Sequence, residues 1–258
     1  MADSSLLTLP IRQVVPATPR ARIVRVDLQG RRFDYRPGQA VMVGLPGARR
    51  RPYSLAGAPN DAQRDGCLEL LIGTEHNTPE FQRGLVAGAS VDVEGPIGSF
   101  TFDAGPGENH FAFIAGGTGI AAIRSMLRHA LRIPRHTAQL LYFTRSRDEF
   151  AYGDEFRALA STGRVDLHRS ITRGFGDHGW TEGRGRPTHE QLVRIVRGGA
   201  AVCFICGPSS FVLAARATLI EVGMPPERVR VEKWLIPSPA AAAPPLLRPS
   251  LAVASFAS

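Results

Sequence analysis

Arg51, Pro52, Tyr53 and Ser54 place a permanent cation, an aromatic ring and a small hydroxyl within four consecutive residues. They follow an apolar segment, residues 40–45, whose composition predicts a β-strand. Because side chains alternate along an extended chain, Arg51 and Tyr53 are expected on one face and Ser54 on the other. A guanidinium can bind a phosphate, a phenol ring can pack on a flat ring system, and a hydroxyl can hydrogen-bond to a ring nitrogen. The stretch is therefore a candidate flavin site. The alternative is a surface arginine beside an ordinary strand tyrosine.

A predicted helix start lies about 25 residues further on. Thr78 is placed as the N-cap, Pro79 at the first helical position, and Glu80 in the first turn. Helix N-termini attract anions, so this one could receive a phosphate of the ligand held by Arg51. The alternative is a well-capped helix with no ligand.

Two glycine-containing turns each follow a predicted buried strand and open a predicted helix. The first is Gly116, Gly117, Thr118 and Gly119, and the second is Cys206, Gly207 and Pro208. In an open parallel sheet, ligands bind outside the carboxyl ends of the strands, where glycine allows close backbone approach to a pyrophosphate. We therefore expect both turns to face one crevice, with Cys206 at its floor. A plain turn and a buried apolar cysteine are the alternatives.

The hydrophobic pattern divides the chain into two parts. From about residue 11 to 101, short strands separated by Gly/Pro turns predict an N-terminal antiparallel β-barrel. Beyond it, apolar strands alternate with helices, which predicts a C-terminal α/β parallel-sheet (Rossmann-like) nucleotide-binding domain. Its predicted strands are 111–115, 139–143, 165–168, 201–206 and 229–231, and its predicted helices are 120–131, 153–159, 188–196 and 209–222. We assign residues 1–105 to the barrel, 106–236 to the α/β domain, and 237–258 to an extended or disordered Ala/Pro-rich C-terminal tail.

The composition of the chain argues against some metal sites and partners and favours others. Three cysteines cannot supply a four-thiolate iron–sulfur site, and Cys203 and Cys206 are expected on opposite faces of one strand. The seven histidines show no metal-ligand spacing, so we expect no metal site. No apolar run is long enough for a membrane helix and no signal sequence is recognised, so a cytoplasmic location is expected. The net charge of +8 comes from scattered arginines, which favours an acidic protein partner over nucleic acid.

Taken in order, these motifs resemble the ferredoxin–NADP reductase superfamily over about residues 10–234. The motifs that carry the resemblance are Arg51-Pro52-Tyr53-Ser54, Gly95-Pro96-Ile97-Gly98-Ser99-Phe100, Gly116-Gly117-Thr118-Gly119-Ile120 and Cys206-Gly207-Pro208. The resemblance implies a flavin-binding barrel and a pyridine-nucleotide domain, with a hydride passing from nicotinamide to flavin and leaving as single electrons. It implies that Arg51, Pro52, Tyr53, Ser54 and Thr78 bind the flavin and that Trp234 could cover it. It further implies that Gly116, Gly117, Thr118, Gly119, Cys206, Gly207 and Pro208 bind the dinucleotide, and that Ser54 and Cys206 are catalytic.

Three positions bear on which cofactors are used. The segment after the second strand of the nucleotide domain contains Thr144, Arg145 and Arg147 followed by two acids, and these groups suit both NADH and NADPH. Arg173 could add positive charge, so we lean slightly towards NADPH. Glu75 stands where relatives commonly have glycine, so it must face away from a flavin diphosphate, or the flavin is FMN rather than the expected FAD. Ala121 and Ala122 replace a common Thr-Pro pair.

The resulting hypothesis is a flavin-dependent NAD(P)H oxidoreductase that passes single electrons to an acidic ferredoxin-like carrier or a partner oxygenase component. One alternative is a flavin or ferric-chelate reductase with a small acceptor. Another is a nucleotide-binding subunit or sensor that does not turn over.

Overall fold

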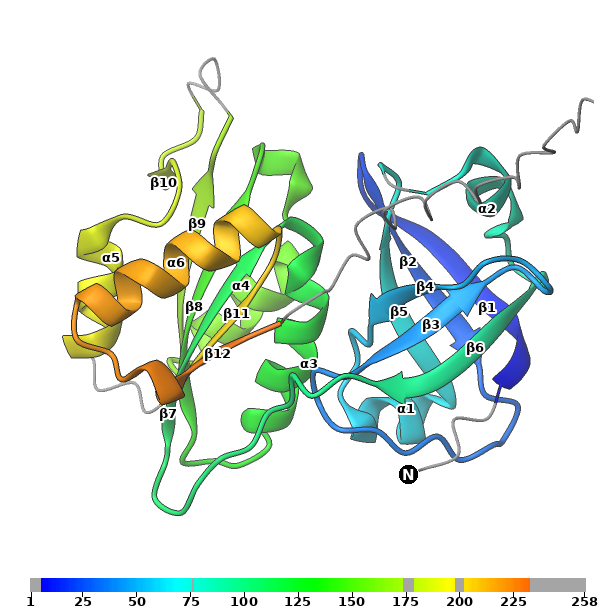
Figure 1. Cartoon of the computed structure of the whole chain (residues 1–258), viewed down its shortest axis with the longest axis horizontal. Coiled ribbons are helices and arrows are strands. Elements are labelled where there is room, and N and C mark those ends of the chain that lie inside the picture. Colours follow the sequence, from blue (N-terminus) through cyan, green and yellow to red (C-terminus); the bar gives the residue numbers. More distant parts are fainter. Residues whose placement is uncertain (1–5, 76, 174–178, 198–201, 233–258) are drawn as a thin grey trace, which may run out of the picture.

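The computed structural model describes residues 6–75, 77–173, 179–197 and 202–232. They form two units side by side, an antiparallel barrel and a parallel sheet covered by helices (Figure 1). The predicted fold class is confirmed. Within the described residues, no helix is both long enough and apolar enough to cross a membrane.

Six antiparallel strands make the barrel. In spatial order they are β4 (Arg51–Ser54), β3 (Ala40–Gly44), β6 (Ser90–Ile97), β1 (Leu6–Thr18), β2 (Ala21–Asp27) and β5 (Cys67–Gly73). A bridge between Leu55 and Leu70 joins the two ends of this order and closes the barrel. Strand β1 begins earlier than predicted because Leu7 and Leu9 also alternate and pair with β6.

Two short helices belong to the barrel. Helix α2 (Pro79–Gly84) has the predicted N-cap, since the Thr78 hydroxyl accepts a hydrogen bond from Phe81 N at 3.3 Å. Gly84, its last residue, packs against Leu45, where a methyl group would lie 2.6 Å from a leucine methyl carbon. Helix α1 (Pro59–Asp65) was not predicted.

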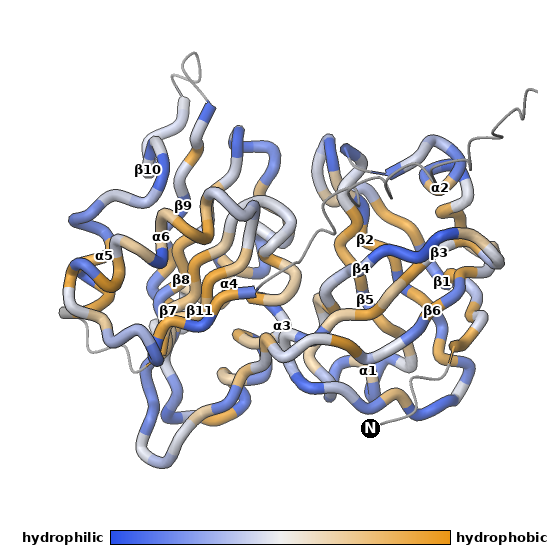
Figure 2. The backbone as a smooth tube through the Cα atoms, viewed as in Figure 1, coloured by the Kyte–Doolittle hydropathy of each residue, from blue (hydrophilic) through white to orange (hydrophobic). Residues whose placement is uncertain are grey.

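The second sheet is parallel throughout. Its spatial order is β10 (Gly183–Arg184), β9 (Val165–Ile171), β8 (Thr137–Thr144), β7 (His110–Gly116), β11 (Val202–Cys206) and β12 (Val229–Val231). The two-residue strand β10 was not predicted. Helices α3 (Ile120–Ala130) and α4 (Gly153–Ser161) pack on one face, and α5 (His189–Arg197) and α6 (Ser209–Glu221) on the other. Figure 2 shows the hydrophobic residues concentrated along the central strands.

The two cysteines of β11 face opposite sides of the sheet, as predicted. Cys206 belongs to the core beneath α3 and α4, and Cys203 to the core beneath α5 and α6. Both thiols are free and buried.

Helix α3 connects the sheet to the barrel. The Ser125 hydroxyl, which is fully buried, donates to the carbonyl oxygen of Gly57 at 2.6 Å. Arg124, on the same helix, donates to the carbonyl oxygen of Ala56 and to the carboxylate of Glu69, both at 2.8 Å. These bonds fix the position of one unit against the other.

Candidate active site

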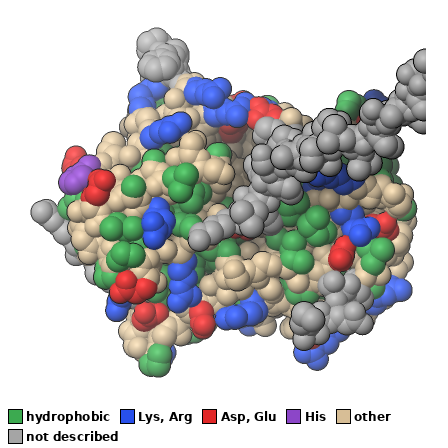
Figure 3. Space-filling model, viewed as in Figure 1, with side chains coloured by type: hydrophobic (Ala, Val, Ile, Leu, Met, Phe, Trp, Pro, Cys, Tyr) green, Lys and Arg blue, Asp and Glu red, His purple; other side chains and the backbone are tan. Residues whose placement is uncertain are grey.

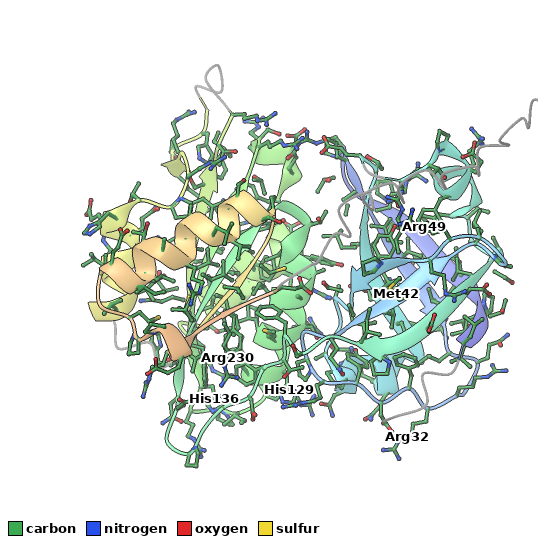
Figure 4. All side chains as sticks on the ribbon, in the orientation of Figure 1. Arg32, Met42, Arg49, His129, His136 and Arg230 are labelled. Carbon is green, nitrogen blue, oxygen red and sulfur yellow. The ribbon has the colours of Figure 1, made fainter. Side chains whose placement is uncertain are left out.

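A cavity of about 220 Å³ opens on the barrel between β3, β4 and the start of α2. Its lining includes Arg49, Arg51, Tyr53, Asn77 and Thr78. Arg51 and Tyr53 therefore share one face of β4, as strand alternation predicted. Figure 4 shows Arg49 in the part of the barrel nearest α2. Two arginines, a phenol and two small polar side chains suit the phosphate end of a flavin nucleotide. Glu80 also lines the cavity, and its carboxylate bonds to Arg83 at 3.2 Å.

Tyr53 is held in one orientation. Its ring stacks on Phe81 with the centroids 6.1 Å apart, and its hydroxyl donates to the Asn77 side chain. Asn77 in turn donates to the carbonyl oxygen of Gly73 at 2.7 Å. Burial raises the pKa of Tyr53 to about 12, so the phenol stays neutral and presents an aromatic surface with a fixed dipole.

Ser54 contributes to a second group of residues that joins the two units. Its hydroxyl donates to Glu232 Oε1 at 3.2 Å, and the Cys206 thiol donates to Glu232 Oε2 at 2.7 Å. The backbone N–H of Glu232 also donates to the carbonyl oxygen of Ile205 at 3.1 Å, which anchors the acid beside β11. The chain thus brings together two predicted site residues and a carboxylate that was not predicted.

The thiol of Cys206 is kept protonated by its surroundings. The residue is 2% exposed, and burial, followed by the nearby Glu232 carboxylate, raises the pKa of the thiol well above its usual value. A protonated thiol is a hydrogen-bond donor and a poor nucleophile. Cys206 can therefore orient a ligand and is not suited to attack one.

The position of Glu232 in the sequence could have indicated that it belongs to the site. It is the first residue after the last strand of the sheet, at the edge where ligands bind in open α/β folds.

Trp234, proposed from sequence to cover the flavin, lies outside the described residues.

The two glycine turns meet, as predicted. A methyl group on Gly119 would lie 2.5 Å from the carbonyl oxygen of Cys206, and one on Gly207 would lie 3.1 Å from the backbone of Gly116. No larger residue fits without separating the turns. Glycine at both turns therefore lets the two backbones pack directly against each other, and it allows a pyrophosphate to approach the same backbone closely.

Ala121 and Ala122, which replace the Thr-Pro pair common among relatives, are buried at the start of α3. They pack in the hydrophobic core beneath the sheet.

The loop after β8 holds the remaining predicted residues. Thr144 is buried, and its hydroxyl donates to the carbonyl oxygen of Ser146 at 2.8 Å. Arg145 forms an ion pair with Glu75 of the barrel at 2.5 Å, and Arg147 is exposed on the same loop. Glu75 therefore points towards the parallel sheet, as expected if it avoids the flavin diphosphate.

Comparisons with known proteins agree with this geometry. A family model described as oxidoreductase NAD-binding domain matches residues 113–217. Ferredoxin–NADP reductase B of Sorangium cellulosum (strain So ce56) is 30% identical over 235 residues, which cover 87% of this chain and 94% of that protein. The chain belongs to the ferredoxin–NADP reductase superfamily.

Two further relatives extend the comparison. The ferredoxin reductase component of 3-ketosteroid-9-alpha-monooxygenase from Rhodococcus rhodochrous is 30% identical over 209 residues, which cover 78% of this chain and 56% of that protein. The structure of the Amycolatopsis cytochrome P450 reductase GcoB has a TM-score of 0.76 at 25% identity, covering 90% of this chain and 73% of that one.

Membership confirms the resemblance that the motifs indicated. The chain is an NAD(P)H-dependent flavoprotein oxidoreductase of the type that uses FAD and a nicotinamide dinucleotide. The barrel cavity and the paired glycine turns fit these two groups. Among the described residues, no group of three or more His, Cys, Asp or Glu side chains is placed to hold a metal ion.

Proposed function

We propose that this superfamily member takes a hydride from NADH or NADPH and passes electrons singly to an acidic, ferredoxin-like carrier or oxygenase component. The R. rhodochrous relative is itself the ferredoxin reductase component of a monooxygenase, which supports a partner of this kind. The net charge of +8 supports it too, and basic side chains are spread over both units on the face shown in Figure 3.

Each part of the site has a role in this proposal. Bound FAD supplies the conversion of a two-electron donor into single electrons. Arg51 binds the flavin phosphate, Tyr53 shapes the cavity, and Thr78 fixes the start of α2 beside it. Pro52, expected from the sequence to bind the flavin, is exposed and does not line this cavity, because it lies between Arg51 and Tyr53 and so faces the other side of β4. The dinucleotide is held by Gly116, Gly117, Thr118, Gly119, Gly207 and Pro208, with Thr144, Arg145 and Arg147 at its adenosine end.

The observation that carries the proposal is the contact of Ser54 and Cys206 through Glu232. One hydroxyl from the barrel and one thiol from the sheet converge on a single carboxylate. A flavin ring beside Ser54 and a nicotinamide beside Cys206 would then meet at this point. Ser54 and Cys206 each have one proton to donate, which the structure directs to Glu232, so on binding of the rings these hydrogen bonds would pass from the carboxylate to the ring atoms.

The first experiment asks whether the protein is a reductase. The purified protein should show a flavin absorption spectrum, and anaerobic addition of NADH or NADPH should bleach it. A colourless protein that binds neither FAD nor FMN, or a flavin that neither coenzyme reduces, would refute the proposal.

A pair of cysteine variants tests the role of Cys206. Cys206→Ala should slow flavin reduction about tenfold at saturating coenzyme without changing flavin content, since one oriented donor is lost. Cys203→Ala removes a buried thiol from the same strand on the opposite face, so it should keep the wild-type rate. Equal rates in both variants would exclude Cys206 from the site.

The dependence of the reduction rate on ionic strength tests whether the electron acceptor is an acidic protein. Reduction of an acidic ferredoxin should fall steeply as ionic strength rises, while reduction of ferricyanide at saturating concentration should change little. Rapid turnover with free flavin or a ferric chelate and none with any ferredoxin would instead favour a reductase with a small acceptor.

A further inference from the structure

We propose that Glu75, a residue of the flavin-binding barrel, makes the enzyme prefer NADH over NADPH by pairing with Arg145 of the nucleotide-binding sheet. This inference rests on the proposed reductase function. It names a residue outside the nucleotide domain that determines which coenzyme that domain accepts.

Arg145 lies where a 2′-phosphate would be recognised. It directly follows β8, which pairs in parallel with β7, the strand that leads into the Gly116–Gly119 turn. When a dinucleotide pyrophosphate lies at the first strand-to-helix turn, its adenosine ribose reaches the end of the next strand. An arginine at that point accommodates the 2′-phosphate of NADPH, whereas a carboxylate accepts a hydrogen bond from the 2′-hydroxyl of NADH.

The guanidinium of Arg145 is engaged by the barrel. Its Nη1 lies 2.5 Å from Glu75 Oε1, and the same oxygen lies 2.9 Å from Arg20 Nη1. Arg20 also forms an ion pair with Glu149, whose other carboxylate oxygen accepts a hydrogen bond from the backbone N–H of Arg145 at 3.3 Å. Two arginines and two glutamates, two from each unit, thus form one network across the boundary.

This network opposes a phosphate more than a hydroxyl. A 2′-phosphate bound by Arg145 would compete with Glu75 for the guanidinium and would lie close to the carboxylates of Glu75 and Glu149. A ribose hydroxyl needs no free guanidinium and can donate to a carboxylate. The hydrogen bond from Arg145 lowers the pKa of Glu75, so this carboxylate is charged at neutral pH.

The size of the effect is moderate because the network is partly solvated. The Arg145 and Glu75 side chains are 38% and 39% exposed, so solvent screens the pair. We expect a change of about tenfold in coenzyme preference on removal of the Glu75 charge, rather than a complete reversal.

The test uses the flavin-loaded protein and Glu75→Gln, which keeps the shape of the side chain. The wild type should have the higher kcat/KM with NADH. The variant should raise kcat/KM for NADPH about tenfold and leave that for NADH within about twofold. In calorimetry at low salt, the variant should bind 2′,5′-ADP about tenfold more tightly than the wild type does, with 5′-AMP unchanged.

Two controls separate the mechanism from a general charge effect. The double variant Glu75→Gln/Arg145→Gln should lose the gain for NADPH, because the freed guanidinium is then absent. Glu190→Gln makes the same change in net charge on the exposed surface of α5, where Glu190 pairs with Arg194, and should leave the preference as it is.

Several outcomes would overturn the inference. They are a wild type that prefers NADPH, a coenzyme ratio that shifts less than twofold in Glu75→Gln, or an equal shift in Glu190→Gln. If neither coenzyme reduces the wild-type flavin, the reductase function itself fails. The binding of 2′,5′-ADP and 5′-AMP would still report on Glu75 in that case.

Discussion

Replacing Arg124 with alanine should destabilise the protein more than most single substitutions. The side chain is 9% exposed, and its guanidinium bonds to Glu69 and Glu155, each at 2.8 Å. It also donates to the carbonyl oxygen of Ala56 at 2.8 Å and lies 4.1 Å from the centre of the Tyr152 ring. Arg124→Ala therefore removes a buried cation that pairs with Glu69 and Glu155, and it removes the hydrogen bond from this side chain to the carbonyl oxygen of Ala56.

The expected magnitude follows from what each partner retains. Breaking a buried ion pair by deleting one member costs about 3–5 kcal/mol. Glu69 keeps a bond to Arg25 at 2.8 Å and Glu155 keeps one to Arg128 at 2.7 Å, so the lower end of this range applies. For a chain of this size, a loss of about 3 kcal/mol corresponds to a fall in Tm of roughly 6–12 °C.

Thermal unfolding followed by flavin release measures this change. Arg64→Ala is the matched control, because that side chain is 61% exposed on the surface of α1 and pairs with Asp61 and Asp65. It should shift Tm by about 1 °C or less. Arg124→Lys should recover only part of the loss, since one ammonium cannot reach three acceptors in a plane. A fall in Tm of less than about 2 °C in Arg124→Ala would refute the interpretation of this network as an anchor.

Two further predictions concern the crevice and the pH response. Gly119→Ala should weaken NADH binding about 10- to 100-fold in a fluorescence titration, because its methyl group would lie 2.5 Å from the carbonyl oxygen of Cys206 at the end of β11. Gly153→Ala is the control, since a methyl group there makes only ordinary contacts, and it should bind NADH normally. Equal NADH affinities in the two variants would contradict the steric argument. Burial lowers the pKa values of His110, His129 and His136 below 6.5. The unfolded chain therefore takes up more protons than the folded protein below pH 6.5, so the free energy of unfolding should fall as the pH drops. Each histidine contributes at most about 1.4 kcal/mol per pH unit. His136→Gln should flatten this fall between pH 6.5 and 5, and an unchanged slope would exclude that histidine.

Most of the fold could be predicted from patterns among residues close together in the sequence. Alternation of apolar residues located the strands of both sheets, and the Thr78–Pro79 start of α2 was visible because capping depends on neighbouring residues. Helix α1 was missed because it buries only Ala62 and so shows no apolar period. It still has a Pro at its first position and Asp61 three residues after its N-cap, which together predict a helix start.

The candidate site was predictable only where its residues belong to recognisable turns. Gly119 and Cys206 lie in such turns, and their contact follows from the topology of a parallel sheet. Glu75 and Arg145 are 70 positions apart in different units, and no periodicity or spacing reports on such a pair. The slight preference for NADPH came from the arginines near this loop, and it stays a prediction that the coenzyme measurements on Glu75→Gln will decide.

The distance between Ser54 and Glu232 depends on how the barrel and the sheet are held together. Ser54 is fixed by the pairing of β4 with β3, and Glu232 by its backbone bond beside β11. Neither pairing crosses between the units, so the contacts of Arg124 with the barrel are among those that set the separation. Hydride transfer requires the two rings to approach closely in a defined orientation, whereas both glycine turns that would hold the pyrophosphate belong to the sheet unit. At temperatures where Arg124→Lys remains folded, it should therefore reduce its flavin more slowly than the wild type while binding NADH with similar affinity.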